Sequence, residues 1–258
     1  MNKFVKRKRF SILYILTVFL LSYSCGSKKD VVYFQNAKDF ETLVDTDSFT
    51  PKFKVNDIVS IYVSTFDLEA AEPFNLKKGQ SASGGLEYID YLIDVDGNID
   101  YPVLGKIKLL GLTVEEGKVL LKKKLADYLK DPIVNIRILN FRISVHGEVN
   151  SPGIYEVPGE RVTLLQAIAM AGDLRIKGKR ENVLVIRDFN GSKTFTRIDL
   201  TNKELFNSPV YYLTQNDIVY VEPNKSAISD AYLDARVNTA ISIASILITT
   251  AIVLITRN

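Results

Sequence analysis

Very few residues of this chain could take part in covalent or metal chemistry. His146 is the only histidine and Cys25 the only cysteine among its 258 residues. One histidine cannot supply a histidine pair for a metal. It would also have to serve in any serine–histidine–aspartate triad, for which no nucleophile-elbow motif is present. A structural role is the simpler interpretation of His146, and we predict no catalytic residue and no cofactor.

Four oxygen-bearing side chains at alternate positions suggest a calcium loop at first sight: Asp94, Asp96, Asn98 and Asp100. An EF-hand loop needs glycine at its sixth position and glutamate at its twelfth. Gly97 comes too early for that spacing, whereas Asp-Gly-Asn between apolar segments is typical of a tight hairpin turn. We therefore predict a turn formed by Asp96, Gly97 and Asn98, and no metal site.

Cys25 follows a segment that has the features of an export signal. Five basic residues precede an apolar run from Phe10 to Leu21. This run is shorter than the roughly 20 residues that a transmembrane helix needs. It leads into Ser22-Tyr23-Ser24-Cys25, which resembles a bacterial lipobox apart from the bulky Tyr23. We predict cleavage after Ser24 and acylation of Cys25, for example by palmitate; the alternative is an ordinary signal peptide with an incidental cysteine.

The positive net charge of the chain belongs to this signal. Residues 1–24 contain five of the 33 basic residues and none of the 30 acidic residues. Their removal changes the formal net charge from +3 to −2, so the basic character gives no argument for nucleic-acid binding. A lone cysteine also excludes an intramolecular disulfide in the exported protein.

Alternating apolar residues predict a first unit of strands and one helix. Residues 26–50 are polar and irregular, which indicates a tether. Residues 66–86 contain several glycines and serines, which predicts a long loop or an insertion. Thr113 and Glu116 form a capping box, which predicts a helix that ends at Asp131-Pro132. Strands are expected over residues 53–63, 88–94, 99–103 and 133–139.

A second unit repeats the order of strand, turn, strand, capped helix and strand. Its turn is expected at Asn150-Ser151-Pro152-Gly153. Its helix starts with a capping box of Thr163 and Gln166 and ends before Gly172. Strands are expected over residues 141–145, 154–157, 183–187, 194–198 and 218–221. Two such units predict an α+β chain of two small β-rich domains, divided near residue 140.

The C-terminal segment Val237–Thr256 carries no charge. As a helix it would be about 30 Å long, the thickness of the hydrocarbon core of a membrane. Most of its polar side chains share one face: Asn238, Ser242, Ser245, Thr249 and Thr256. Three interpretations stay open. This polar stripe packs against a neighbouring helix, it lines water inside a ring of identical helices, or its hydroxyls bond the backbone of a simple anchor.

Several of these motifs together resemble the outer-membrane polysaccharide export family (Wza-like). The resemblance rests on three stretches: Phe53–Ile61, Ile93–Gly105 and Val145–Tyr155. The first is similar to the start of the family's export domain, with Asn56 in place of the usual glycine, and the second to its DxDGxIxxPxLG region. The third resembles the start of the β-grasp-like SLBB domain, in which Gly147, Pro152 and Gly153 are implied to form turns.

The resemblance implies a ring-forming, lipid-anchored channel without catalytic residues. The family's rings are octameric, and its members pass capsular or exopolysaccharide to the cell surface together with an inner-membrane polysaccharide co-polymerase. The lipid would lie on the periplasmic side of the outer membrane, and the C-terminal helix would span toward the cell surface. The alternative is a lipid-anchored periplasmic glycan-binding module whose C-terminal helix is only an anchor.

These predictions divide the chain into five parts, which are a signal peptide (1–24), a lipid-anchored tether (25–50), an export domain (51–140), an SLBB domain (141–224) and a C-terminal transmembrane helix (225–258).

Overall fold

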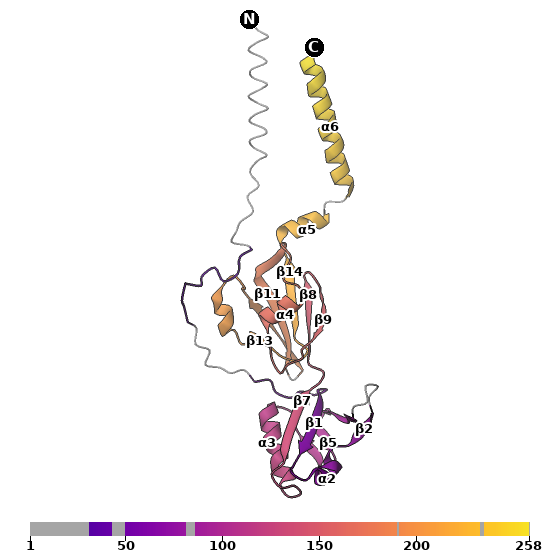
Figure 1. The fold of residues 1–258 in the computed structure, drawn as a ribbon. Coiled ribbons are helices and arrows are strands. Elements are labelled where there is room, and N and C mark those ends of the chain that lie inside the picture. Colours follow the sequence, from indigo (N-terminus) through magenta and orange to yellow (C-terminus); the bar gives the residue numbers. More distant parts are fainter. Residues whose placement is uncertain (1–30, 43–49, 81–85, 190, 233–234, 258) are drawn as a thin grey trace.

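The computed structural model describes residues 31–42, 50–80, 86–189, 191–232 and 235–257. They form two lobes, each with its own hydrophobic core, followed by a projecting helix (Figure 1). The core of the first lobe lies between Phe53 and Ile136 in the sequence, and that of the second between Phe141 and Val221. The chain is therefore a mixed α and β protein with several small sheets.

The first lobe is built around β1 (Ile58–Ser64). This strand lies between β4 (Asp90–Leu92) and β7 (Ile133–Ile138) in an antiparallel sheet, and every second residue of β1 is buried. Helix α3 (Val114–Leu125) packs against β7. Its predicted capping box is confirmed, because the Thr113 hydroxyl accepts from the Glu116 amide at 3.2 Å and the Thr113 amide donates to the Glu116 carboxylate at 2.8 Å.

The predicted end of this helix was wrong. Helix α3 ends at Leu125, several residues before Asp131-Pro132. Leu129 is nevertheless buried in the first core. The residues that follow the helix therefore still place an apolar side chain in the core, although they are no longer part of the helix. Asp131 has a φ of 48°, which a helix cannot include. The apolar spacing therefore extended the prediction past the true end of the helix.

The prediction of a loop over residues 66–86 was also wrong. This stretch contains a short helix, a 3-10 helix and a strand pair: α2 (Leu68–Ala71), η2 (Glu72–Phe74) and β2 (Lys77–Gln80) with β3 (Leu86–Tyr88). Asp67 caps α2 by accepting from the amides of Glu69 and Ala70, and Pro73 lies in the first turn of η2. A proline at such a position starts a helical turn instead of breaking one.

The turn of the hairpin predicted around Gly97 is present, but the two strands beside it do not pair with each other. Strand β4 pairs with β1, whereas β5 (Asn98–Tyr101) pairs with β6 (Gly105–Lys108), a strand that the apolar pattern did not predict. The Gly97 carbonyl accepts from the amides of Leu109 and Leu110, so the chain that follows β6 closes against the turn.

The second lobe contains a five-stranded sheet in the order β12-β11-β14-β8-β9. Neighbouring strands of this sheet are antiparallel, except for β14 and β8, which are parallel. The strands are β8 (Arg142–Gly147), β9 (Gly153–Glu156), β11 (Gly178–Phe189), β12 (Ser192–Ile198) and β14 (Ile218–Pro223). Two short strands pair beside it: β10 (Val162–Thr163) and β13 (Tyr212–Leu213).

The second capping box is confirmed as well. The Thr163 hydroxyl accepts from the Gln166 amide at 3.1 Å, and helix α4 (Leu164–Met170) follows. Gly172 has a φ of +74°, as expected for a glycine that ends a helix. The remaining helices are η3 (Lys203–Asn207), α5 (Lys225–Tyr232) and α6 (Ala235–Arg257). Figure 1 shows α5 at the end of the second lobe and α6 projecting beyond it.

Candidate functional site

Helix α6 contains Ser242, Ser245 and Thr249 of the predicted polar stripe, and the hydroxyls of Ser245 and Thr249 bond the helix backbone. Ser245 Oγ donates to the Ser242 carbonyl at 2.8 Å, and Thr249 Oγ1 donates to the Ser245 carbonyl at 2.7 Å. Thr250, off the stripe, makes the same kind of bond to the Ile246 carbonyl at 2.7 Å. Each of these hydroxyl oxygens keeps a lone pair with which it can accept a further hydrogen bond. The stripe is therefore compatible with water, with a second helix or with a simple anchor.

The large apolar side chains along α6 are exposed in the single chain. Ile243, Ile246, Leu247, Ile248 and Leu254 each have more than half of their surface exposed. Soluble monomers rarely expose large apolar side chains in such number on one helix, and such surfaces mark sites of contact with proteins or membranes. Within the residues that the structure describes, no helix has the length and apolarity required to cross a membrane.

Four of the predicted site residues cannot be placed. Cys25 and Ser24 lie outside the described residues, as do the side chains of Asn238 and Thr256. The structure therefore leaves lipidation as a prediction. It also leaves open where these two members of the stripe point.

The predicted turn residues of the first lobe lie together. The Asp94 carboxylate accepts from the amides of Asp96 and Asn98, at 3.0 and 2.8 Å, and Gly97 has a φ of +83°. The carboxylate of Asp94, one of the four side chains that suggested a calcium loop, is thus used within the turn. Among the described residues, no three His, Cys, Asp or Glu side chains gather as metal ligands.

The turn residues of the second lobe have different roles. Gly147 has a φ of +89°, and a Cβ there would lie 2.0 Å from the Val221 carbonyl oxygen, so this position requires glycine where β8 meets β14. A Cβ on Gly153 would meet nothing closer than 4.0 Å, so nothing requires glycine at that position. Pro152 directly precedes β9, and His146 is an exposed residue of β8.

The described part of the predicted tether lies against the second lobe. The amides of Phe34 and Gln35 donate to the carbonyls of Leu200 and Thr201, at 3.2 and 2.7 Å. The Phe34 ring stacks on Phe206, with 5.6 Å between ring centroids. This segment is therefore part of the folded lobe instead of a free linker.

Tyr33 fixes the same segment by a polar contact. Its hydroxyl donates to Asp173 Oδ1 at 2.5 Å, and its ring lies 5.9 Å from the guanidinium of Arg180. Burial, followed by the hydrogen bond to Asp173, raises the pKa of the Tyr33 hydroxyl, so it remains a neutral donor at physiological pH. Arg180 is itself buried and donates to the carbonyls of Arg175 and Gly178, at 3.1 and 2.7 Å.

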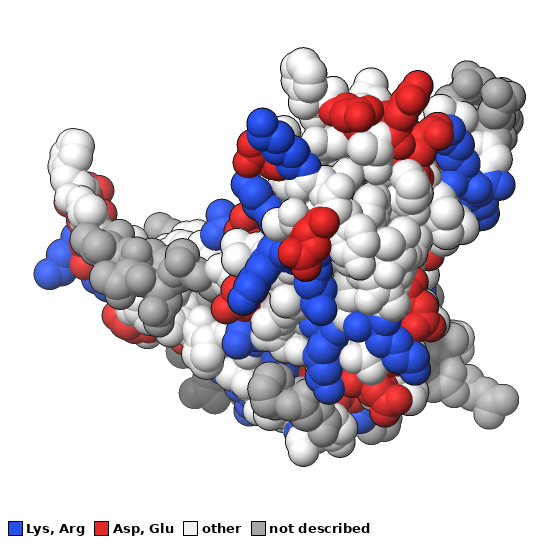
Figure 2. Space-filling model, turned by 90° about the horizontal axis from the view of Figure 1, so that it is seen from below, with Lys and Arg blue, Asp and Glu red and all other residues white. Residues whose placement is uncertain are grey.

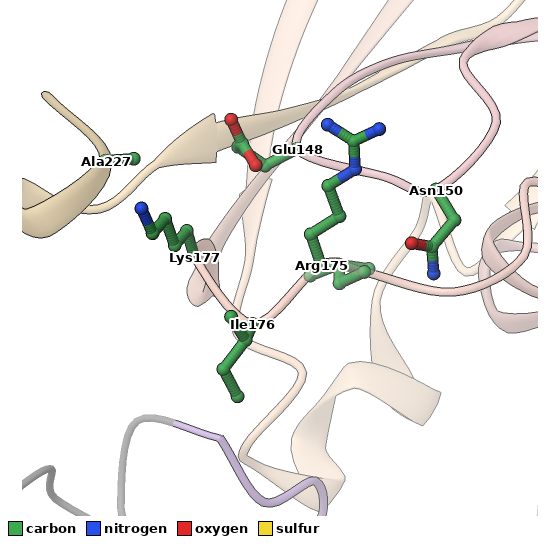
Figure 3. Close-up of a pocket in the computed structure, with 7 residues that line it drawn as sticks. Glu148, Asn150, Arg175, Ile176, Lys177 and Ala227 are labelled. Atoms are coloured by element: carbon green, nitrogen blue, oxygen red, sulfur yellow. The ribbon is translucent and has the colours of Figure 1, made fainter. Parts of the chain in front are cut away.

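The loop that Arg180 organises lines a hollow of the described surface. This cavity of about 580 Å³ lies between that loop, the residues that follow β8 and helix α5. Figure 3 shows Glu148, Arg175 and Lys177 among the residues that line the cavity. Lys177 forms an ion pair with Asp230 of α5, so it ties the second lobe to the C-terminal helices. The basic side chains of Arg175 and Lys177 share the cavity with the acidic side chain of Glu148. The charge of the cavity is therefore mixed and does not indicate a particular ligand.

The two lobes meet at two turns that share a sequence. Asn56-Asp57-Ile58-Val59 opens β1, and Asn216-Asp217-Ile218-Val219 opens β14. In both turns the asparagine has a positive φ, 68° and 66°, which asparagine tolerates better than most residues. In both, the amide three residues before the aspartate donates to its Oδ2, at 2.8 and 2.7 Å. The repeat was present in the sequence, and comparing the two units residue by residue would have found it.

The two turns are joined by Lys54. Its ammonium donates to Thr214 Oγ1 at 2.9 Å and to the Gln215 carbonyl at 3.2 Å. Burial lowers the pKa of Lys54, while the nearby Asp217 opposes that shift. Asn140, between the lobes, adds a second link, because it accepts from the Ile58 amide at 2.9 Å and its carbonyl accepts from Gln215.

The surface charges of the lower end of the molecule are mixed. Figure 2 shows basic and acidic side chains interspersed on this face, without a continuous field of one sign. Such a surface suits solubility in water and offers no extended anion-binding stripe on this face.

The fold is that of a two-lobed mixed α and β protein with a projecting helix that exposes apolar side chains. Residues 48–139 match the family described as polysaccharide biosynthesis/export protein, and residues 142–196 match the SLBB domain. The chain therefore belongs to the polysaccharide biosynthesis/export family, and an SLBB domain follows its export domain. The predicted family resemblance is confirmed.

Two relatives bear the name EPS I polysaccharide export outer membrane protein EpsA. The one from Ralstonia solanacearum is 29% identical over 141 residues, which are 53% of this chain and 37% of that protein. The one from Ralstonia nicotianae is 32% identical over 97 residues, which are 36% of this chain and 26% of that protein. The matched segments thus span well under half of either relative.

Proposed function

We propose that this protein is the outer-membrane component through which a capsular or exopolysaccharide leaves the cell. The observation that carries the proposal is the succession, in one chain, of an export domain, an SLBB domain and a projecting helix with exposed apolar side chains. The names of the two relatives support the outer membrane and the polysaccharide. Energy for transport would come from elsewhere, since the protein conducts the polymer passively.

The proposed channel is a homo-oligomer, because one helix cannot enclose a pore. We propose a ring in which copies of α6 together enter the outer membrane, with their apolar side chains toward lipid. Ser242, Ser245 and Thr249 then face the pore or the adjacent helix. An octamer, as in the family's rings, is the expected size. An acylated Cys25 holds each copy in the periplasmic leaflet, and an inner-membrane polysaccharide co-polymerase delivers the polymer.

A second candidate function is a lipid-anchored periplasmic glycan-binding module with α6 as a simple anchor. The observation that favours it is the bonding of Ser245, Thr249 and Thr250 hydroxyls to their own helix backbone. Hydroxyls bonded in this way are satisfied within a single helix and require no pore.

Conductance of the full-length lipoprotein in planar bilayers separates the two candidates. Thr249→Val removes a hydroxyl from the stripe, and Thr250→Val is the matched control because Thr250 makes the same backbone bond off the stripe. A water-lined stripe predicts a discrete conductance that changes in Thr249→Val and stays the same in Thr250→Val. Absence of conductance together with measurable polysaccharide affinity would favour the glycan-binding module.

A further inference from the structure

The sheet of the second lobe ends in two strands that each have one partner. Strand β12 pairs only with β11, and β9 pairs only with β8, among the residues that the structure describes. An unpaired sheet edge presents backbone donors and acceptors to any strand that approaches it. The two edges lie at opposite ends of one sheet, so a copy on either side can reach one of them.

The hydrogen-bonding pattern shows which residues of β9 face outward. In an antiparallel pair, residues alternate between those whose backbone groups face the partner strand and those whose groups face away. The Val157 amide donates to the Phe141 carbonyl at 2.8 Å, toward β8. By this alternation, the backbone groups of Ile154 and Glu156 point away from the sheet.

The same alternation applies to β12. The Leu200 amide donates to the Arg180 carbonyl at 2.8 Å, so Leu200 and every second residue before it face β11. The backbone groups of Lys193, Phe195 and Arg197 therefore point away from the sheet. Each edge thus offers a row of open backbone groups.

The topology fixes how these edges would meet. Strand β11 is antiparallel to both β12 and β14, so β12 and β14 run in the same direction. Strand β14 is parallel to β8, so β12 also runs in the direction of β8. Strand β9 runs opposite to β8. The strands follow the long axis that α6 continues (Figure 1), and a rotation about such an axis preserves their directions. β12 of one copy therefore meets β9 of the next in antiparallel fashion.

The side chains of the two edges are complementary. Phe195 is 64% exposed and Ile154 66% exposed. Phe195 lies opposite Ile186 of β11, and Ile154 lies opposite Ser144 of β8. Ile186 and Ser144 alternate with the core residues of their strands. Phe195 and Ile154 are therefore on the face of the sheet away from the core. In antiparallel pairing with Phe195 opposite Ile154, Lys193 lies opposite Glu156.

We propose that β12 of one copy adds to β9 of the next copy in this register, so that the sheets of neighbouring subunits become continuous around the ring. The inference rests on the homo-oligomer of the proposed function. Because the two edges differ, the contact is heterologous, and repeated rotation closes it into a ring. The cross-strand pairs Phe195–Ile154 and Lys193–Glu156 give the interface its register.

Disulfide trapping in the full-length lipoprotein tests the pairing. Directly opposite residues of a hydrogen-bonded pair have Cα atoms about 5.5 Å apart, within the range that a disulfide spans. Phe195→Cys combined with Ile154→Cys should give a ladder of disulfide-linked multimers under mild oxidation. Phe195→Cys combined with Ile133→Cys, which is exposed on β7 of the first lobe, should give none, and the unsubstituted chain reports any bond through Cys25.

A charge reversal provides an independent check of the register. Lys193→Glu places two acidic residues opposite each other and should shift the native mass in detergent toward smaller species. Lys193→Glu combined with Glu156→Lys should restore the mass of the unsubstituted protein. A merely structural effect of either substitution would not be rescued by the second.

The outcomes separate this inference from the proposed function. A multimeric protein that yields no ladder from the Phe195→Cys/Ile154→Cys variant, and no rescue by the double charge reversal, would overturn the edge pairing and leave the channel intact. A strictly monomeric protein that yields no ladder would overturn both.

Discussion

The turn that opens β1 and the turn that opens β14 have the same Asn-Asp-Ile-Val sequence and the same backbone, yet their buried carboxylates differ. Asp57 is 1% exposed, and its Oδ1 has no hydrogen-bond partner. Asp217 is fully buried and receives the Thr214 hydroxyl at 2.9 Å and the guanidinium of Arg187, with the closest contact at 2.7 Å. Local sequence thus determines the turn, and distant residues determine whether its charge is compensated.

This contrast assigns different roles to the two lobes. The carboxylate of the second lobe is part of a complete network, which also connects to Lys54 of the first lobe through Thr214. The carboxylate of the first lobe is incompletely bonded, and burial raises the pKa of Asp57 to about 6. We expect the first lobe to lose stability over the pH range in which Asp57 loses its proton.

Removal of the compensated carboxylate should have the largest effect. Asp217→Ala leaves the guanidinium of Arg187 and the amide of Thr214 without their partner, and we expect a loss of about 3–5 kcal/mol in the free energy of unfolding. Circular dichroism during urea denaturation measures it, since the chain contains no tryptophan. The control is Glu72→Ala, whose ion pair with Lys77 is exposed, and this variant should lose far less. Equal losses in both variants would show that the buried network of Asp217 stabilises the protein no more than an exposed ion pair does.

Replacement of the uncompensated carboxylate should change the pH dependence of stability. The pKa of Asp57 rises from 3.8 in the unfolded chain to about 6 in the folded one, so the folded state binds more protons between these values. Stability therefore falls as the pH rises from 4 to 6, by at most about 3 kcal/mol.

Asp57→Asn should flatten this dependence and leave the first lobe at least as stable as the unsubstituted protein at neutral pH. Thermal unfolding followed between pH 4 and pH 7 measures it. An unchanged pH profile, or a loss at neutral pH as large as that of Asp217→Ala, would contradict the assignment.

The link between the turns should give the smallest effect. In a double-mutant cycle, Lys54→Met and Thr214→Val each remove one partner of the hydrogen bond that joins the lobes. We expect a coupling energy of about 1 kcal/mol. The same cycle with Lys52→Met, an exposed neighbour, should show no coupling. No coupling for Lys54 would mean that the two turns are neighbours without being linked.

The features that the sequence predicted correctly are local ones. Both capping boxes lie where Thr113 and Thr163 indicated, because the helix start depends on contacts within four residues. Asn56, which stands in place of the usual glycine, has a positive φ of 68°, a conformation that asparagine tolerates.

The features that the sequence did not reveal depend on distant residues. Strand β6 is held by its pairing with β5 and by the contact of the following residues with Gly97, and residues 33–35 are held by Asp173, Leu200 and Thr201. No periodicity encodes such partners. In the candidate site, the stripe of α6 follows directly from helical spacing, but the environment it faces depends on copies and lipids that a single chain does not contain.

The claim that this chain exports a polysaccharide is tested most directly by the amount of polymer on the cell surface. Cells that lack the chain, cells supplied with the full chain and cells supplied with a chain ending after Arg236 should be compared, with the chain detected in the membrane fraction of the last two. The account predicts that surface polymer is lost without the chain, restored by the full chain and not restored by the shortened one. Normal surface polymer in cells that lack the chain would contradict it.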